Sequence, residues 1–157
     1  MYNILFVCYG NICRSPMAEM IFKDIIYKNS KRYMFSCVSR ATSMEEIGND
    51  IYPQAKDKLK EKGITCENHR ATLLKKEDYK LYDLIIVMEN RNKEDVLRIV
   101  GDDINNKVHL LLEYTDNLRE IDDPWYTGDF DKAFDLIYEG CVGLYNYLVN
   151  KGDYDEI

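Results

Sequence analysis

The chain has 157 residues, of which 31% are charged, and its formal net charge is −7 at pH 7. Because nucleic-acid binding needs a basic surface, this excess of carboxylates argues against a nucleic-acid partner. No apolar stretch is long enough to cross a membrane and no signal peptide opens the chain, so we expect no association with a membrane. The five cysteines are irregularly spaced, which argues against a disulfide framework and favours a reducing compartment, the cytoplasm.

Apolar runs that are typical of buried strands alternate along the chain with segments of helical periodicity. The first strand is expected at Ile4–Val7, and Pro16 lies in the first turn of the helix that follows it. Further strands are expected at 33–38, 84–88 and 107–112, and further helices at 52–62, 92–100 and 130–149. This order predicts an α/β fold: a single domain over residues 1–157, with an open, twisted parallel sheet of about four strands and helices on both faces. The acidic tail, 153–157, is expected to be frayed.

The segment between the first strand and the first helix has the features of a phosphate-binding loop. It consists of Cys8, Tyr9, Gly10, Asn11, Ile12, Cys13, Arg14 and Ser15. Backbone N–H groups of such a loop point, with the positive end of a helix dipole, into one small space. Gly10 is expected to permit a tight loop, and Asn11 to tolerate a left-handed conformation.

The side chains of this loop suit phosphoryl transfer. A free thiol has a pKa of about 8.5, and N–H donors beside a guanidinium favour its thiolate form, so Cys8 is predicted to be a nucleophile. Arg14 matches two phosphate oxygens with its planar fork, and Ser15 is placed to donate a hydrogen bond to the sulfur. The alternative is that Cys8 is a small apolar core residue at the end of a strand.

A zinc site is disfavoured. Zinc-binding cysteines are more closely spaced and come with a second pair, whereas Cys37, Cys66 and Cys141 stand alone. We therefore expect no metal at the Cys8 loop.

A second motif lies far downstream, at Ile121-Asp122-Asp123-Pro124-Trp125-Tyr126. Together with the Cys8 loop it resembles the low-molecular-weight protein tyrosine phosphatases, in which an aspartate directly before a proline acts as general acid. The resemblance covers nearly the whole chain, including its length. It implies that Asp123 is the general acid and base, with Asp122 as the reserve candidate. Alone, such a motif is typical of a solvated acidic turn.

An acid at Asp123 suits an aryl phosphate. Tyrosine leaves as a phenolate whose conjugate acid has a pKa of about 10, so the departing oxygen needs a proton. A carboxylic acid supplies that proton and later accepts one from the attacking water. Pro124 restricts the residue before it to an extended backbone, which stiffens the acidic loop.

Further residues enter through the resemblance. Ser39 matches a family serine that steadies the loop at Asn11, and His69 matches a family histidine of the same network; the alternative for both is an ordinary turn residue. The segments at Ser39 and Glu89 are expected to follow strands and to meet the Cys8 loop at the carboxyl edge of the sheet. His109, in an apolar strand, is expected to be a packed core histidine.

Some positions depart from the family pattern and bear on substrate preference. Glu89 replaces an aspartate that supports the central arginine, and Arg40 replaces a small residue. Glu45 replaces a rim residue that is often aromatic. The residues expected to line the substrate pocket are Ile12, Glu45, Trp125 and Tyr126, of which the aromatic pair suits a planar phenyl phosphate.

The resemblance implies a protein tyrosine phosphatase that forms a cysteinyl-phosphate intermediate and needs no cofactor. The expected partners are phosphotyrosine-containing proteins or small aryl phosphates, inorganic phosphate is the product, and the protein is expected to be a monomer or a weak dimer. Three alternatives remain. A protein-arginine phosphatase of the same fold has threonine at the position of Ile12, and an arsenate reductase needs a cysteine relay that Cys37 and Cys66 do not form. A phosphotyrosine-binding module would need no general acid.

Cys13 carries a separate redox hypothesis. A second thiol in the loop would trap oxidised Cys8 as a disulfide and protect it from irreversible oxidation. The alternative is that Cys13 packs beneath the loop.

Overall fold

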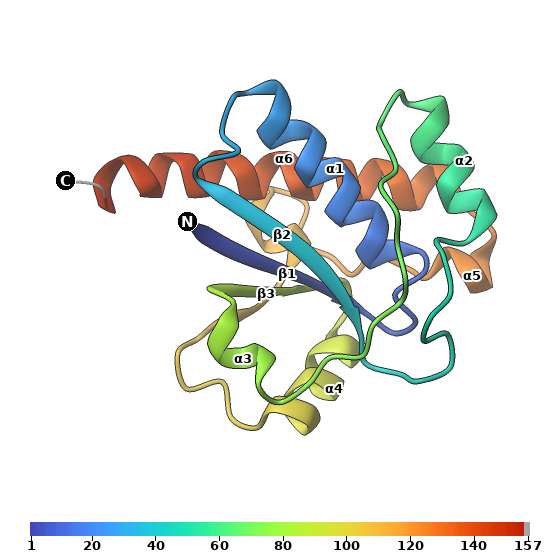
Figure 1. The fold of residues 1–157 in the computed structure, drawn as a ribbon, viewed down its shortest axis with the longest axis horizontal. Helices are drawn as coiled ribbons and strands as arrows, with labels where there is room; N and C mark the ends of the chain where they lie inside the picture. Colours follow the sequence, from blue (N-terminus) through green and yellow to red (C-terminus); the bar gives the residue numbers. More distant parts are fainter. Residues whose placement is uncertain (156–157) are drawn as a thin grey trace.

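The computed structural model describes the backbone of residues 1–155 and the side chains of residues 1–151. Its centre is a four-stranded sheet in the order β2-β1-β3-β4, in which all neighbouring strands run parallel (Figure 1). The strands are β1 (Tyr2–Cys8), β2 (Phe35–Ala41), β3 (Leu84–Val87) and β4 (Val108–Leu110). The predicted open parallel sheet is therefore confirmed.

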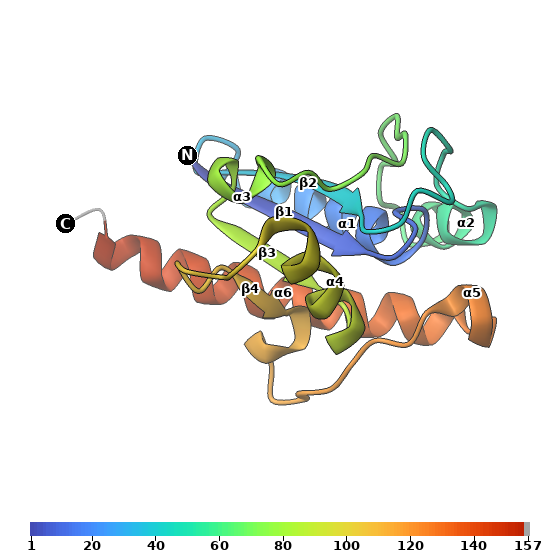
Figure 2. The ribbon, with the colours of Figure 1, turned by 90° about the horizontal axis from the view of Figure 1, so that it is seen from below.

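Helices cover both faces of this sheet, as predicted. One side carries α1 (Arg14–Lys28), α2 (Pro53–Glu61) and α6 (Phe130–Asp155), and the other carries α3 (Asp78–Leu81) and α4 (Asn90–Val100). The short α5 (Pro124–Thr127) precedes α6. Figure 2 shows α6 running along the length of the molecule, from α5 to the end at which the N-terminus lies. Within the described residues, no helix is both long enough and apolar enough to cross a membrane.

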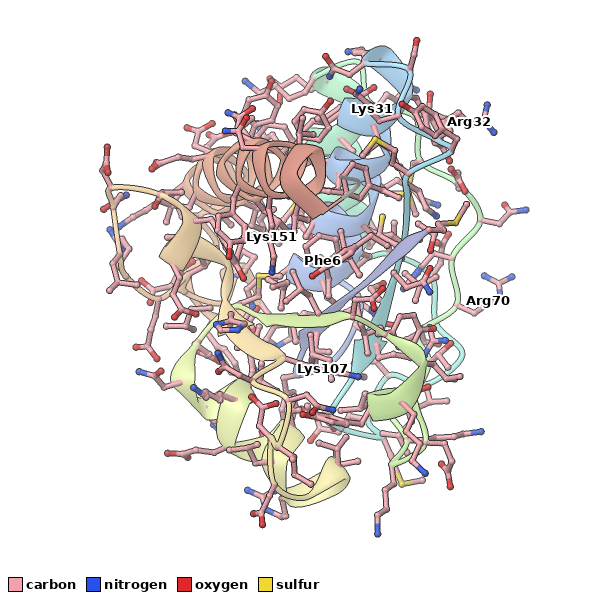
Figure 3. The ribbon with its side chains drawn as sticks, turned by 90° about the vertical axis from the view of Figure 1, so that its left-hand side faces the viewer. Phe6, Lys31, Arg32, Arg70, Lys107 and Lys151 are labelled. Carbon is pink, nitrogen blue, oxygen red and sulfur yellow. The ribbon has the colours of Figure 1, made fainter. Side chains whose placement is uncertain are left out.

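Apolar side chains fill both spaces between the sheet and the helices. Successive residues of a strand point to opposite faces, so Ile4 and Phe6 pack in the cluster that includes α1 and α6, and Leu5 packs in the cluster that includes α4. Figure 3 shows Phe6 inside the molecule, whereas Arg32 and Arg70 project from its surface. A strand covered on both faces needs a continuous apolar run, which is what made β1 recognisable in the sequence.

The edge strand β2 is displaced from its expected position at 33–38. It pairs with β1 up to the pair of Ala41 and Cys8, so Ser39 and Arg40 belong to the strand. The prediction that Ser39 follows the strand was therefore wrong. The side chains of β2 alternate between buried and half-buried positions, and this pattern accommodates polar residues that a central strand would not.

The other differences are at short or terminal elements. The strand expected to reach residue 112 ends at Leu110, because the chain turns into a 3-10 helix, η1 (Leu111–Tyr114). The elements η1, α3 and α5 each span four residues, and elements this short cannot be predicted from a periodic pattern. The helix expected to end at 149 continues to Asp155 and so includes the first residues of the acidic tail, and residues 156–157 lie outside the described part.

His109 is not a packed core histidine as expected. It is half-buried on β4, where its Nε2 lies 2.8 Å from the carbonyl oxygen of Asn106 and its Nδ1 lies 3.5 Å from Glu113 Oε2. Because β4 is the second edge of the sheet, one face of this residue reaches solvent.

Candidate active site

Cys8 and Arg14 lie at the carboxyl end of the central strand β1. The neighbours of β1 are β2 on one side and β3 on the other, so the chain changes direction across the sheet at this point. Such a switch point opens a crevice beyond the ends of the strands. Here it holds a cavity of about 80 Å³, lined by Cys8, Tyr9, Gly10, Ile12, Cys13, Arg14, Glu45, Glu46, Asp123, Trp125 and Tyr126.

The sulfur of Cys8 is surrounded by hydrogen-bond donors. The backbone N–H groups of Asn11 and Ser15 donate to Sγ over 3.3 and 3.4 Å, and the hydroxyl of Ser15 lies 3.0 Å from it. Cys8 is only 2% exposed, so few waters compete with these donors. These donors are placed to stabilise negative charge on the sulfur.

Further donors of the loop have no acceptor. Within the part of the chain that the structure describes, the backbone N–H groups of Gly10, Ile12 and Cys13 donate no hydrogen bond. The Nε of Arg14 is buried and also lacks a partner. Gly10, Ile12, Cys13 and Arg14 all line the same pocket, so this concentration of donors without acceptors indicates an anion-binding site.

The guanidinium of Arg14 is almost fully buried and is held by groups from two other segments. Nη1 donates to the carbonyl oxygen of Ile121 over 2.9 Å, while Nη2 lies 3.3 Å from Glu89 Oε1 and 3.5 Å from Asp123 Oδ2. A buried charge needs such compensation. The longer arm of Glu89 therefore still supports the arginine.

Asn11 organises the back of the loop. It adopts φ 60°, the left-handed conformation that was expected for it, whereas Gly10 does not use positive φ. Its Nδ2 donates to Ser15 Oγ over 2.8 Å and to Ser39 Oγ over 2.9 Å, and its Oδ1 accepts from the backbone N–H of Thr72 over 3.0 Å. The structure thus places Ser39 beside the loop, from within β2.

His69 contacts the same residue through the backbone. Its Nε2 lies 2.7 Å from the carbonyl oxygen of Asn11, and its ring is largely buried. Arg40 does not take part in this network. Its guanidinium instead donates to the carbonyl oxygen of Ser39 and to the hydroxyl of Tyr82.

Asp123 enters the pocket from the acidic loop. It is the N-cap of α5, and its Oδ1 accepts a hydrogen bond from the backbone N–H of Trp125 over 3.0 Å. Its backbone is extended, with φ −74° and ψ 114°, as expected for a residue before proline. Asp122 faces elsewhere, since it lines a separate cavity with Thr127 and Lys132.

Similarity to known proteins agrees with this geometry. The family model described as low molecular weight phosphotyrosine protein phosphatase matches residues 3–153. The chain belongs to this family. The resemblance read from the Cys8 loop and the acidic loop is thereby confirmed.

Members of the family from distant organisms align over nearly the whole chain. The low molecular weight protein-tyrosine-phosphatase YfkJ of Bacillus subtilis is 34% identical over 146 residues, which cover 92% of this chain and 94% of that protein. The low molecular weight phosphotyrosine protein phosphatase of Gallus gallus is 36% identical, with coverage of 95% and 94%. The crystal structure of YfkJ superimposes with a TM-score of 0.93 at 32% identity and covers 96% of each chain.

In this family member, the sequence did not reveal a series of hydrogen-bonded polar side chains behind the Cys8 loop. The hydroxyl of Ser39 donates to Glu19 Oε1 over 2.7 Å, and Lys23 Nζ lies 2.6 Å from Glu19 Oε2. Burial lowers the pKa of Lys23, but the hydrogen bond and the charge of Glu19 outweigh burial and raise it overall. The available signal was a glutamate within the apolar run from Met17 to Phe22.

Tyr52 was also missed, although it fixes the aromatic wall of the phosphatase pocket. Its ring packs edge-on against Trp125 at 4.8 Å and stacks on Phe130 at 5.9 Å. Its backbone N–H donates to the carbonyl oxygen of Ile12 over 2.8 Å, which links the wall to the Cys8 loop. Tyr126 lines the pocket too but is 79% exposed.

Cys13 lies in the pocket, whereas neither Cys37 nor Cys66 lines it. Burial raises the pKa of the Cys13 thiol, and the nearby charges of Cys8 and Asp123 raise it further. The Cys13 thiol is therefore neutral at rest.

Proposed function

We propose that this chain is a protein tyrosine phosphatase that hydrolyses phosphotyrosine through a phosphorylated Cys8. One observation carries the proposal: Cys8, Arg14 and Asp123 line a single small pocket whose loop presents N–H donors without acceptors. Membership of the phosphatase family supports it independently.

In the first step the thiolate of Cys8 attacks phosphorus. An S–P bond forms while the bond between phosphorus and the tyrosine oxygen breaks. Asp123 transfers a proton to that oxygen, so tyrosine leaves as a neutral phenol. Arg14 and the loop N–H groups stabilise the charge on the three remaining phosphoryl oxygens.

In the second step water attacks the phosphorus of the cysteinyl-phosphate. Asp123, now a carboxylate, accepts a proton from this water, and the S–P bond breaks. Inorganic phosphate is released and the thiolate of Cys8 is restored. The donors around the sulfur, among them Ser15, stabilise it as a leaving group.

The placement of the two acidic residues supports Asp123 as the acid. Asp123 lines the Cys8 pocket and lies 3.5 Å from Arg14, whereas Asp122 lines a different cavity. The aryl preference is supported by Ile12 and Trp125, whose apolar surfaces border the space above the sulfur. A protein-arginine phosphatase would have to place a charged guanidine against these groups.

The proposed partners are phosphotyrosine-containing proteins or small aryl phosphates. All five cysteines are free, and the nucleophile needs a reduced thiol, so we place the reaction in the cytoplasm. The redox role of Cys13 belongs to the same proposal, because its thiol lines the pocket of Cys8.

The test is release of phosphate from matched phosphotyrosine, phosphoserine and phosphoarginine peptides, without added metal. The expected result is turnover of the phosphotyrosine peptide alone, with none in a Cys8→Ser control that still binds the peptide. Preference for phosphoarginine would keep the nucleophile and overturn the role given to Ile12. Binding without turnover by the unmodified protein would make it a phosphotyrosine-binding module.

A further inference from the structure

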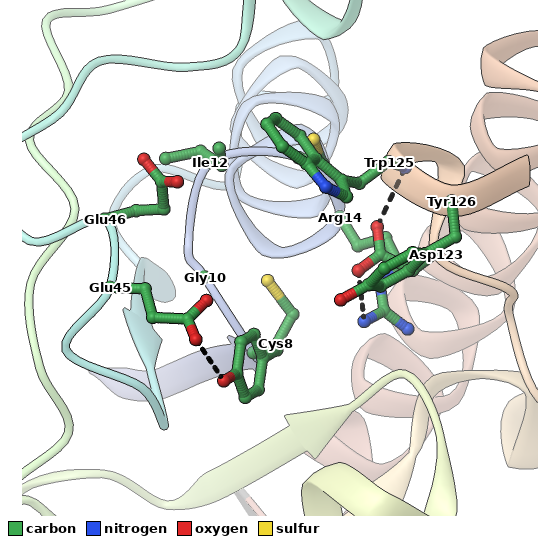
Figure 4. A pocket seen from close by; sticks show the side chains of 11 residues that line it. Cys8, Gly10, Ile12, Arg14, Glu45, Glu46, Asp123, Trp125 and Tyr126 are labelled. Carbon is green, nitrogen blue, oxygen red and sulfur yellow. Dashed lines mark hydrogen bonds and ion pairs between the residues drawn. The ribbon is translucent and has the colours of Figure 1, made fainter. Parts of the chain in front are cut away.

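The mouth of the pocket is acidic, although its interior is built to bind an anion. We define the mouth by Tyr9, Glu45, Glu46 and Tyr126, which line the pocket and are exposed or half-buried. Figure 4 shows Glu45 and Glu46 on one side of the Cys8 sulfur, with Asp123 on the other side. A bound phosphotyrosine would therefore pass between carboxylates before it reaches Arg14.

The two glutamates are held in place at the mouth. The hydroxyl of Tyr9 donates to Glu45 Oε1 over 2.9 Å, and Asn49 Nδ2 donates to Glu46 Oε2 over 2.7 Å. The Cγ atom of Glu46 lies 3.5 Å from the position that a Cβ would take at Gly10, so it packs directly against the phosphate-binding loop. Neither side chain is free to swing away without losing these contacts.

The charges of these glutamates are not neutralised. Their hydrogen-bond partners are uncharged, and within residues 1–151 neither carboxylate forms an ion pair, whereas the nearby Asp50 pairs with Lys56. Their segment, 42–52, contains no lysine or arginine. The guanidinium carbon of Arg91 lies 5.6 Å from the centroid of the Tyr9 ring, so this basic group contacts the mouth at Tyr9 and forms no ion pair with either glutamate.

The opposite wall of the pocket also carries negative charge. On this side Asp123 lines the pocket, whereas Asp122 and Asp129 line a separate cavity. The segment 115–129 contains five carboxylates in all and a single basic residue, Arg119, whose Nε donates to the carbonyl oxygen of Glu120. With a net charge of −7, the protein as a whole does not attract a dianion either. A substrate with a positively charged residue beside its phosphotyrosine would be attracted electrostatically to the mouth.

We infer that Glu45 and Glu46 make the mouth select phosphotyrosine that has lysine or arginine close by in the sequence, and that they disfavour acidic neighbours. The inference rests on the proposed phosphatase function. The phosphate goes to the buried loop, while the neighbouring residues of the substrate stay at the exposed mouth. Exposed ion pairs are weak, so each neighbouring charge is expected to change kcat/KM by about two- to fivefold.

The experiment compares kcat/KM for three phosphotyrosine peptides that differ only in their flanking residues, which are lysine, alanine or glutamate. We expect the order lysine, alanine, glutamate, and a spread that shrinks as salt rises, since a Debye length of about 8 Å at physiological ionic strength screens such charges. The salt series needs no variant, so it tests the inference in the unmodified protein.

Variants then assign the effect to the mouth. In the double variant Glu45→Gln/Glu46→Gln the lysine-to-glutamate ratio should fall toward one. Glu45→Lys changes the charge of the mouth by the same two units and should lower the ratio to a similar extent. Glu139→Gln removes the same charge from an exposed position on α6 and should leave the ratio unchanged. Each ratio is measured within one variant, so a change in overall activity cancels.

The outcomes separate this inference from the proposed function. Equal kcat/KM for the three peptides, or a ratio that survives in the double glutamine variant, would overturn selection by the mouth while leaving the phosphatase intact. Failure to hydrolyse any of the peptides would count against the proposed function itself.

Discussion

The side chain of Asn11 should contribute far more to stability than its size suggests. It is fully buried and makes hydrogen bonds to Ser15, Ser39 and the backbone N–H of Thr72. At about 1 kcal/mol net for each bond, their loss costs about 3 kcal/mol. The left-handed backbone, with φ 60°, adds about 1 kcal/mol when alanine replaces asparagine but not when glycine does.

We therefore expect Asn11→Gly to lower the free energy of unfolding by about 3 kcal/mol and Asn11→Ala by about 4 kcal/mol. Urea-induced unfolding of both variants and the unmodified protein gives these values directly, and it does not depend on any assay of activity. Losses below about 1 kcal/mol in both variants would show that the network adds little. Equal losses in the two would refute the argument from the left-handed backbone.

Three further predictions concern the acid, the second thiol and the long helix. Asp123→Ala should slow the hydrolysis of phenyl phosphate by about 10²- to 10⁴-fold, and that of a substrate with an activated leaving group far less. Asp122→Ala should leave both rates near normal, and the reverse pattern would reassign the acid. Peroxide inactivation should be reversed by thiols in the unmodified protein but not in Cys13→Ser, and equal recovery would remove the protective role. Gly143→Ala should destabilise the fold by about 1–3 kcal/mol in thermal unfolding, despite the higher helix propensity of alanine. The new Cβ would lie 2.3 Å from the carbonyl oxygen of Tyr114, so an unchanged Tm would show that the backbone yields there.

The Cys8 loop was recognisable because its residues are contiguous in the sequence. Cys8, Arg14 and Ser15 belong to one continuous segment between a strand and a helix, and both elements carry clear patterns. Their donors converge because a loop at a helix N-terminus orients its N–H groups in one direction. The conformation of Asn11 follows from the same local geometry.

The acidic loop was predictable only through the family resemblance. An Asp-Asp-Pro segment in a chain with 28 carboxylates carries little information alone. The sequence could not show which aspartate faces the sulfur, because that depends on the N-cap of α5 and on the contact between Asp123 and Arg14. Both interactions exist only once the end of β1 and the start of α5 have come together.

By itself, the sequence determined the parallel α/β architecture, the position of the Cys8 loop between a strand and a helix, and the family. These follow from periodic apolar runs and contiguous motifs, which act over a few residues. Only the tertiary structure decided that Ser39 acts from within β2, that Glu19 and Tyr52 support the loop, and that Glu45 and Glu46 form an acidic mouth. Each of these contacts joins side chains from segments that are far apart in the sequence and meet at the carboxyl edge of the sheet. Strand register and helix packing set the distances between these side chains.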